Sequence, residues 1–153
     1  MSVNEGGFPM SVNPVPAGFH TIAPNIIVKN VDAAVSFYKR AFGAEEILRL
    51  NMPDGKVTHC ELKFGDSRVN LGEAMEGWPE HSLLAQIFVA DSDAVFAQAV
   101  EAGAEVLSPV TDMFFGSREG RVLDPFGSTW TISTHTENVS VEEMQQRLNA
   151  LAA

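Results

Sequence analysis

His59 and Glu61 are the two residues whose types and spacing best suit acid–base chemistry. They lie two positions apart in a strand-like run, 56–64, so their side chains project from the same face. Histidine changes its protonation near neutral pH, and a neighbouring carboxylate can orient its ring. The pair is a candidate catalytic acid–base couple. Alternatively, the two side chains have no catalytic role and are part of the ordinary polar face of a half-buried strand.

Arg68 and Asn70 share one face of the next strand-like run, 67–73. An arginine on a strand face can hold a carboxylate or phosphate through two parallel hydrogen bonds. The competing interpretation pairs Arg68 with Glu61 on the neighbouring strand. If the alternation holds, the same concave side also carries further polar and aromatic groups, a mixed lining typical of small-molecule sites. These groups are Asn25, Gln86, Phe88, Thr129, Thr131 and Ser133, with Arg118 or Arg121 reaching in from the strand over 118–123.

The stretch Arg121 to His135, RVLDPFGSTWTISTH, shows how the chain separates its two faces. The D-P-F-G segment is typical of a tight turn between strands. After it, large apolar residues alternate with hydroxyl residues, which indicates a two-faced strand. Trp130 and Ile132 are expected beneath a helix, with Thr131 and its hydroxyl neighbours on the concave side.

The elements that must position these residues are repeated along the chain. The segment from Ile27, IVKNVDAAVSFYKRAFGAEEIL, matches that from Phe88, FVADSDAVFAQAVEAGAEVL, at an offset of 61 that becomes 60 after the helix. Each half reads as strand, helix and three strands, with Asn30 or Asp91 as helix N-cap. Ser140 and Glu143 form a capping box that predicts a last helix from about Val141.

These patterns predict an α+β fold. Two βαβββ modules, about 20–75 and 82–136, form a curved mixed sheet around a groove, with helices on the convex side and a C-terminal helix over about 140–151. Residues 14–153 are expected to form one domain after a flexible extension over 1–13.

Composition narrows the classes of function. The net charge of −10 argues against nucleic acid and anionic membranes as partners. The single cysteine, Cys60, excludes an intrachain disulfide and a thiolate zinc site, and a core position is expected for it. No apolar run approaches the roughly 18 residues of a membrane span, and the first residues do not resemble a signal peptide. A cytoplasmic protein is expected.

Four segments carry a resemblance to a known family: IVKNVDAAVSFYKRAFGAEE (27–46), MPDGKVTHCELKFGDSRV (52–69), DMFFGSREGRVLDPFGSTW (112–130) and ISTHTENVSVEEM (132–144). The chain resembles the vicinal oxygen chelate superfamily, which includes glyoxalase I, extradiol dioxygenases and bleomycin-resistance proteins, and within it the PhnB-like branch. The resemblance implies a homodimer. The chain departs from the branch at Phe115, Ser117 and Ser128, where tryptophan, aspartate and histidine are usual.

In metal-dependent members of that superfamily, four His or Glu ligands lie on the first and last strand of each module. The corresponding places here fall near Ala23, Asn70, Leu84 and Thr131, and none is a histidine, acid or cysteine. Transition metals prefer imidazole, thiolate or carboxylate, so neither a family-type metal nor another cofactor is expected. An alternative cluster would join His59 and Glu61 to a third ligand from Glu73, His20 or His135.

The loop around Phe114 and Phe115 is too apolar to be only a solvated linker, and burial as a lid over the groove or in a subunit contact would explain it. Three functions follow. The first is a small-molecule-binding protein without metal. The second is a metal-free isomerase, lyase or ring-modifying enzyme acting through His59, Glu61 and Arg68. The third is a metal-dependent glyoxalase or dioxygenase.

Overall fold

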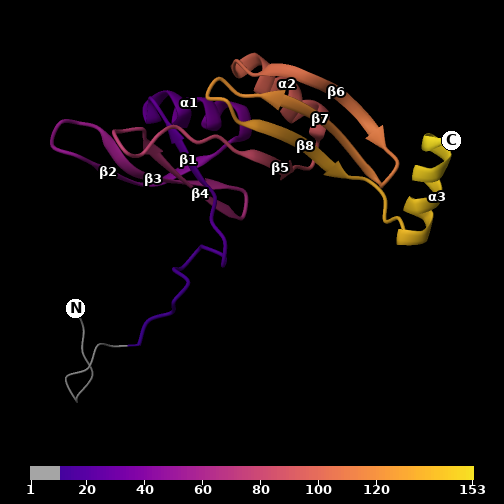
Figure 1. Cartoon of the computed structure of the whole chain (residues 1–153), viewed down its shortest axis with the longest axis horizontal. Helices are drawn as coiled ribbons and strands as arrows, with labels where there is room; N and C mark the ends of the chain where they lie inside the picture. Colours follow the sequence, from indigo (N-terminus) through magenta and orange to yellow (C-terminus); the bar gives the residue numbers. More distant parts are fainter. Residues whose placement is uncertain (1–10) are drawn as a thin grey trace.

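The computed structural model describes residues 11–153, so most of the extension expected over 1–13 lies outside the described residues. The chain folds into two βαβββ modules followed by a helix (Figure 1). Module 1 comprises β1 (Asn25–Val28), α1 (Val31–Phe42), β2 (Glu45–Asn51), β3 (Val57–Phe64) and β4 (Ser67–Glu73). Module 2 comprises β5 (Leu84–Phe88), α2 (Ser92–Ala102), β6 (Glu105–Met113), β7 (Ser117–Leu123) and β8 (Thr129–His135). The last helix is α3 (Val141–Ala152).

Each module forms its own four-stranded mixed sheet, with strand orders β1-β4-β3-β2 and β5-β8-β7-β6. The α+β class, the two modules and the terminal helix are therefore as predicted. The curved sheet that was predicted around a groove is built from two four-stranded sheets, which lie side by side in Figure 1. The two helices pack against each other and join the modules on the convex side, while the opposite side of both sheets stays open.

The repeat in the sequence is visible in the local geometry. Helix α1 has 12 residues and α2 has 11, which accounts for the change of offset. Asn30 and Asp91 accept hydrogen bonds from the backbone N–H groups three residues later, as N-caps do. Helix α1 ends at Gly43, whose φ of 67° is the left-handed conformation that glycine adopts without strain.

An aromatic cluster connects the two modules. Trp130 of β8 lies within 4.9 to 5.7 Å, between ring centroids, of Phe42 and Tyr38 from α1 and of Phe64 from β3. Trp130 is 3% exposed, so the alternation placed it correctly in the interior. Its neighbours come mainly from the other module, because α1 lies over the seam between the sheets.

A buried carboxylate, Asp124, lies at the edge of that cluster. It accepts hydrogen bonds from the Tyr38 hydroxyl (2.6 Å) and from Trp130 Nε1 (2.9 Å). Its other oxygen accepts from the backbone N–H groups of Phe126 and Ser128, which closes the D-P-F-G turn. Burial, and secondly the Asp124 carboxylate, raises the pKa of Tyr38 above its usual value, so the phenol keeps its proton and donates.

We expect Trp130→Ala to lower the free energy of unfolding by about 3–5 kcal/mol, the range for large aromatic truncations in cores. Chemical denaturation measures it. Trp78→Ala is the matched control, because Trp78 is 57% exposed, and surface substitutions of this kind usually change stability by about 0.5 kcal/mol or less. An unchanged denaturation midpoint for the Trp130 variant would contradict the cluster's role.

Candidate functional site

The concave face of the first sheet brings together polar residues from three strands. Asn70 of β4 lies between Asn25 of β1 and Glu61 of β3, its direct neighbours across the sheet. The Oδ1 atom of Asn70 is buried and has no hydrogen-bond partner among residues 11–153. A buried acceptor without a partner carries a desolvation cost, which rotation of the Asn70 side chain toward a donor from outside the chain would relieve.

His59 and Glu61 share this face, as their spacing predicted. His59 Nε2 lies 3.4 Å from Glu61 Oε1. The side chain of His59 is 36% exposed and that of Glu61 is 14% exposed, so the carboxylate is the more sheltered partner. Glu61 is the cross-strand neighbour of Asn70. A molecule bound at Asn70 would therefore lie within reach of the His59–Glu61 pair.

Arg68 has a different neighbour from the one expected. Its cross-strand partner is Lys63, because the register pairs Glu61 with Asn70, two residues further along the strand. No ion pair joins Arg68 to Glu61 within residues 11–153, so the internal-partner interpretation is wrong in this structure. The guanidinium carbon lies 5.7 Å from the centroid of the Phe19 ring, and Gly18 passes directly beside the same head group.

The concave face of the second sheet carries a hydrogen-bonded polar cluster. Gln86 of β5 donates to Ser133 Oγ of β8 (2.9 Å), and Ser133 donates to Glu119 Oε2 of β7 (2.8 Å). Thr131 lies between Gln86 and Arg121, its neighbours on either side. Ser133 is fully buried and its hydroxyl is already engaged, so it supports Gln86 and Glu119 more than it lines an open surface.

Glu119 was not anticipated from the sequence. The run Ser117–Leu123 contains charged residues on both faces, and alternation alone leaves the choice of face open. The packing of α2 on Gly120 decides which face each residue occupies, because a side chain at Gly120 would collide with Phe96 of α2. Gly120 and its same-face neighbours therefore lie beneath the helix, and Glu119 and Arg121 lie on the concave side.

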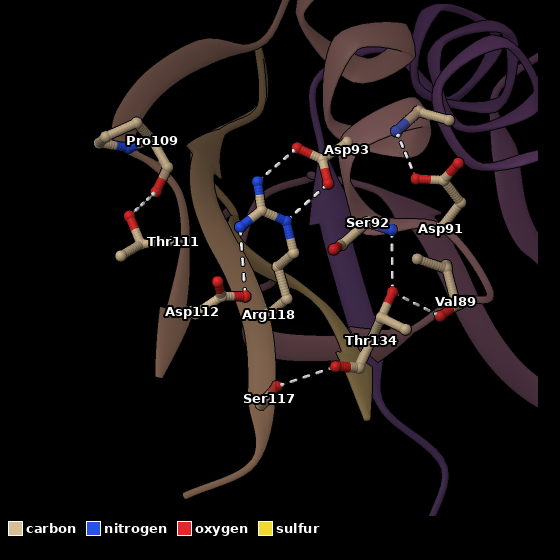
Figure 2. Close-up of polar contacts among 11 residues, drawn as sticks. Val89, Asp91, Ser92, Asp93, Pro109, Thr111, Asp112, Ser117, Arg118 and Thr134 are labelled. Carbon is tan, nitrogen blue, oxygen red and sulfur yellow. Dashed lines mark hydrogen bonds and ion pairs between the residues drawn. The ribbon is translucent and has the colours of Figure 1, made fainter. Parts of the chain in front are cut away.

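Arg118 belongs to the helix-covered face, so its expected place in the groove is wrong. Figure 2 shows its guanidinium joined to both carboxylate oxygens of Asp93 on α2, at 2.7 and 3.0 Å, and to Asp112 of β6 at 3.2 Å. Its hydrogen bonds lower the pKa of Asp93. Arg118 fixes α2 to the sheet. In the same view, Thr134 accepts from the backbone N–H of Ser92 and donates to the carbonyl of Val89.

Phe114 and Phe115 lie in the turn between β6 and β7, at the end of the second sheet beside α3 (Figure 1). Their rings meet edge to face at 5.2 Å. Arg147 of α3 donates to the carbonyl of Phe114 and pairs with Glu137, whose pKa it lowers. The structure therefore places the pair away from Asn70 and Arg68, against the terminal helix.

Cys60 is in the core, as expected, with its thiol 3.6 Å from Glu46 Oε1. Burial raises the pKa of this thiol to about 11, with a further contribution from Glu46. A cysteine of this kind is a poor nucleophile at neutral pH.

The four positions that the resemblance assigns to metal ligands carry no suitable donor set. Across the two parallel strand pairs, Asn25 faces Asn70 and Gln86 faces Thr131, while Ala23 precedes β1 and Leu84 is 81% exposed. Neutral amide and hydroxyl groups do not fit a divalent transition metal, which prefers imidazole, thiolate or carboxylate ligands. Within residues 11–153 no three His, Cys, Asp or Glu residues form a group that could hold a metal, so His59 and Glu61 gain no third ligand.

Comparisons with known proteins place the chain in a family. The model for the glyoxalase/bleomycin resistance protein/dioxygenase superfamily matches residues 18–132. The chain therefore belongs to that superfamily. An uncharacterised protein of Mycobacterium tuberculosis (strain H37Rv) is 30% identical over 158 residues, which cover 94% of this chain and 89% of the relative.

Two solved structures have a similar fold. The chain is similar to TioX from Micromonospora sp. ML1, with 25% identity and a TM-score of 0.63 over 74% of this chain and 97% of that one. It is also similar to a gene product from Arabidopsis thaliana, with 29% identity and a TM-score of 0.57 over 75% and 98%. None of the helices in the described part of the chain is long and apolar enough to cross a membrane.

The donor set predicts that protein purified without chelators holds less than about 0.1 equivalent of zinc, nickel, manganese or iron, because amides and hydroxyls bind these ions weakly. Elemental analysis by mass spectrometry measures it. About one equivalent of metal, lost in His59→Ala or Glu61→Gln but retained in His135→Ala, would contradict the expectation and establish a site at the His59–Glu61 pair.

Proposed function

We propose that this chain is a small-molecule-binding protein of the PhnB-like type that acts without the family metal. The observation that carries the proposal is the buried and unpartnered Oδ1 of Asn70, placed between Asn25 and Glu61 on an open sheet face. Such an oxygen is stabilised when a ligand supplies a donor.

The surroundings of Asn70 indicate an anionic ligand that also carries a donor. Arg68 and Lys63 are cross-strand partners two positions from Asn70, and they form a local positive site on a chain whose net charge is −10. The general field opposes the approach of anions, so binding must rest on that local site. A carboxylate or phosphate at Arg68 and a hydroxyl or amine at Asn70 would satisfy both groups.

The proposal includes a homodimer in which a second copy covers the concave side. Within one chain this side exposes large apolar groups that water does not solvate well: Leu84 is 81% exposed, Phe88 67% and Leu50 57%. A second copy lying over the concave faces would bury them and turn an open surface into an enclosed groove.

One observation favours a second candidate, a metal-free isomerase or lyase. His59 Nε2 lies 3.4 Å from Glu61 Oε1 beside the same Asn70, so a bound substrate would meet an acid–base pair. A binder and an enzyme differ in one respect. In the enzyme, His59→Gln abolishes turnover and leaves ligand affinity nearly unchanged, whereas in the binder no turnover exists to lose.

Binding is tested by a thermal-shift screen of carboxylate and phosphate metabolites, because a ligand that binds only the native state raises its midpoint. For a ligand found in this way, we expect Arg68→Ala to weaken affinity by roughly 2 kcal/mol, as loss of a sheltered charge pair does. Arg68→Lys should recover only part of the loss, since lysine lacks the planar fork. Calorimetry measures both.

Arg118→Ala is the matched control, because Arg118 is engaged with Asp93 on the other side of the sheet. It should leave affinity unchanged. If both Arg68 variants bind as the parent does, the anchor is Arg121 on the second sheet, and the proposed site at Asn70 is wrong.

A further inference from the structure

Strand β5 presents a free edge. It is the outermost strand of its sheet and, within residues 11–153, pairs only with β8. The backbone N–H of Thr129 donates to Leu83, and that of Val89 donates to Ser133. In a parallel ladder, this pattern means that the backbone N–H and C=O groups of the odd-numbered residues of β5 point toward β8. The backbone groups of Leu84, Gln86 and Phe88 therefore point away from the sheet.

The equivalent edge in module 1 is covered. Ile27 of β1 exchanges two backbone hydrogen bonds with His81, each 3.0 Å long. The linker between the modules thus closes the edge of β1, and no described segment does the same for β5. An unpaired strand edge is an available set of alternating donors and acceptors.

A cavity of about 380 Å³ lies along this open edge. Its lining includes five consecutive residues of the β5 segment, Ala85 to Val89. Successive side chains of a strand point to opposite faces, so a cavity lined by a consecutive run faces the edge of the strand and not one of its surfaces. The cavity is therefore distinct from the concave site at Asn70 and Arg68.

The inner wall of the cavity is aromatic. The rings of Phe64 and Trp130 are stacked, with centroids 5.6 Å apart and planes inclined by 21°. The ring centroid of Phe42 lies 4.9 Å from that of Trp130. Val69 and Ile87 add apolar surface between the modules, and Asp66 and Ser67 line a polar side of the same cavity. Such a wall favours a flat ring over a flexible chain, because aromatic pairs gain from offset or edge contacts.

We propose that this inter-module cavity binds a planar bicyclic aromatic molecule whose ring edge carries an N–H donor next to a carbonyl acceptor, as in a lactam. The donor would meet the carbonyl of Gln86, and the acceptor would meet the N–H of Phe88. The ring would fill the slot beside Ile87 and meet Phe64 and Trp130 at the small part of each side chain that is exposed, 7% and 3%. A strand from a second copy would satisfy the edge of β5 but continue the plane of the sheet, leaving the cavity unfilled.

The test uses isoquinolin-1-one as probe and naphthalene as a control of the same shape without donor or acceptor. Two-dimensional ¹H–¹⁵N NMR of the full chain reports the amides of β5 and the indole N–H groups of Trp78 and Trp130, which Trp78→Phe distinguishes. We expect saturable shifts at Phe88 and at the Trp130 indole, no shift at Glu61, and affinity for naphthalene at least tenfold weaker.

Two variants localise the binding. Ala85→Phe places a ring in the cavity and should weaken probe binding at least tenfold. Leu84→Phe is the matched control, because Leu84 lies outside the lining and is 81% exposed, and it should leave binding unchanged. Unfolding midpoints of both variants establish that the fold is kept.

Three results would overturn the proposal. The first is unaltered probe binding in Ala85→Phe. The second is equal binding of naphthalene, which would remove the role of the strand edge. The third is protection of the Gln86 and Phe88 amides from hydrogen exchange without probe, at protein concentrations where the chain is dimeric, which would show that a second copy covers β5.

Discussion

The carboxylate of Asp124 is the constraint on which the arrangement of the two modules depends. One oxygen closes the turn that starts β8, and the other accepts from Trp130 of the same module and from Tyr38 of α1. A buried carboxylate is stable only when its lone pairs are filled, so the turn, the indole and the phenol must be in place together. The position of module 1 against module 2 follows from that requirement.

The two open regions of the molecule are consequences of this seam. Because α1 and α2 meet on the convex side, the sheets turn their polar faces outward on the other side, where Asn70 and the Glu119 cluster lie. Because Tyr38 and Phe64 pack on Trp130 between the modules, the sheets do not merge edge to edge. The unfilled space at that boundary is the cavity beside β5. The contacts of Asp124 thus position both the concave face that carries Asn70 and the inter-module cavity.

The fold was predictable because its signals are local. Helix caps at Asn30 and Asp91, the repeat and the alternation through Trp130 each specify an element without knowledge of the others. The site was predictable only in part. His59 and Glu61 share a face whatever the register, since they lie on one strand. The neighbours of Arg68 depend on how two strands align, and a register shift of two residues replaces Glu61 with Lys63. Arg118 and Glu119 are adjacent charged residues, and only the helix packed on Gly120 decides which faces inward.

The measurement that tests this account most directly is a double-mutant cycle between Tyr38→Phe and Asp124→Asn, followed by chemical denaturation. The account predicts a coupling energy of about 1.5–3 kcal/mol, the range for a hydrogen bond to a charged group. Tyr38→Phe should also increase hydrogen exchange along the seam in both modules. Additive effects of the two substitutions, with exchange unchanged in module 1, would contradict the claim that Asp124 holds the modules together.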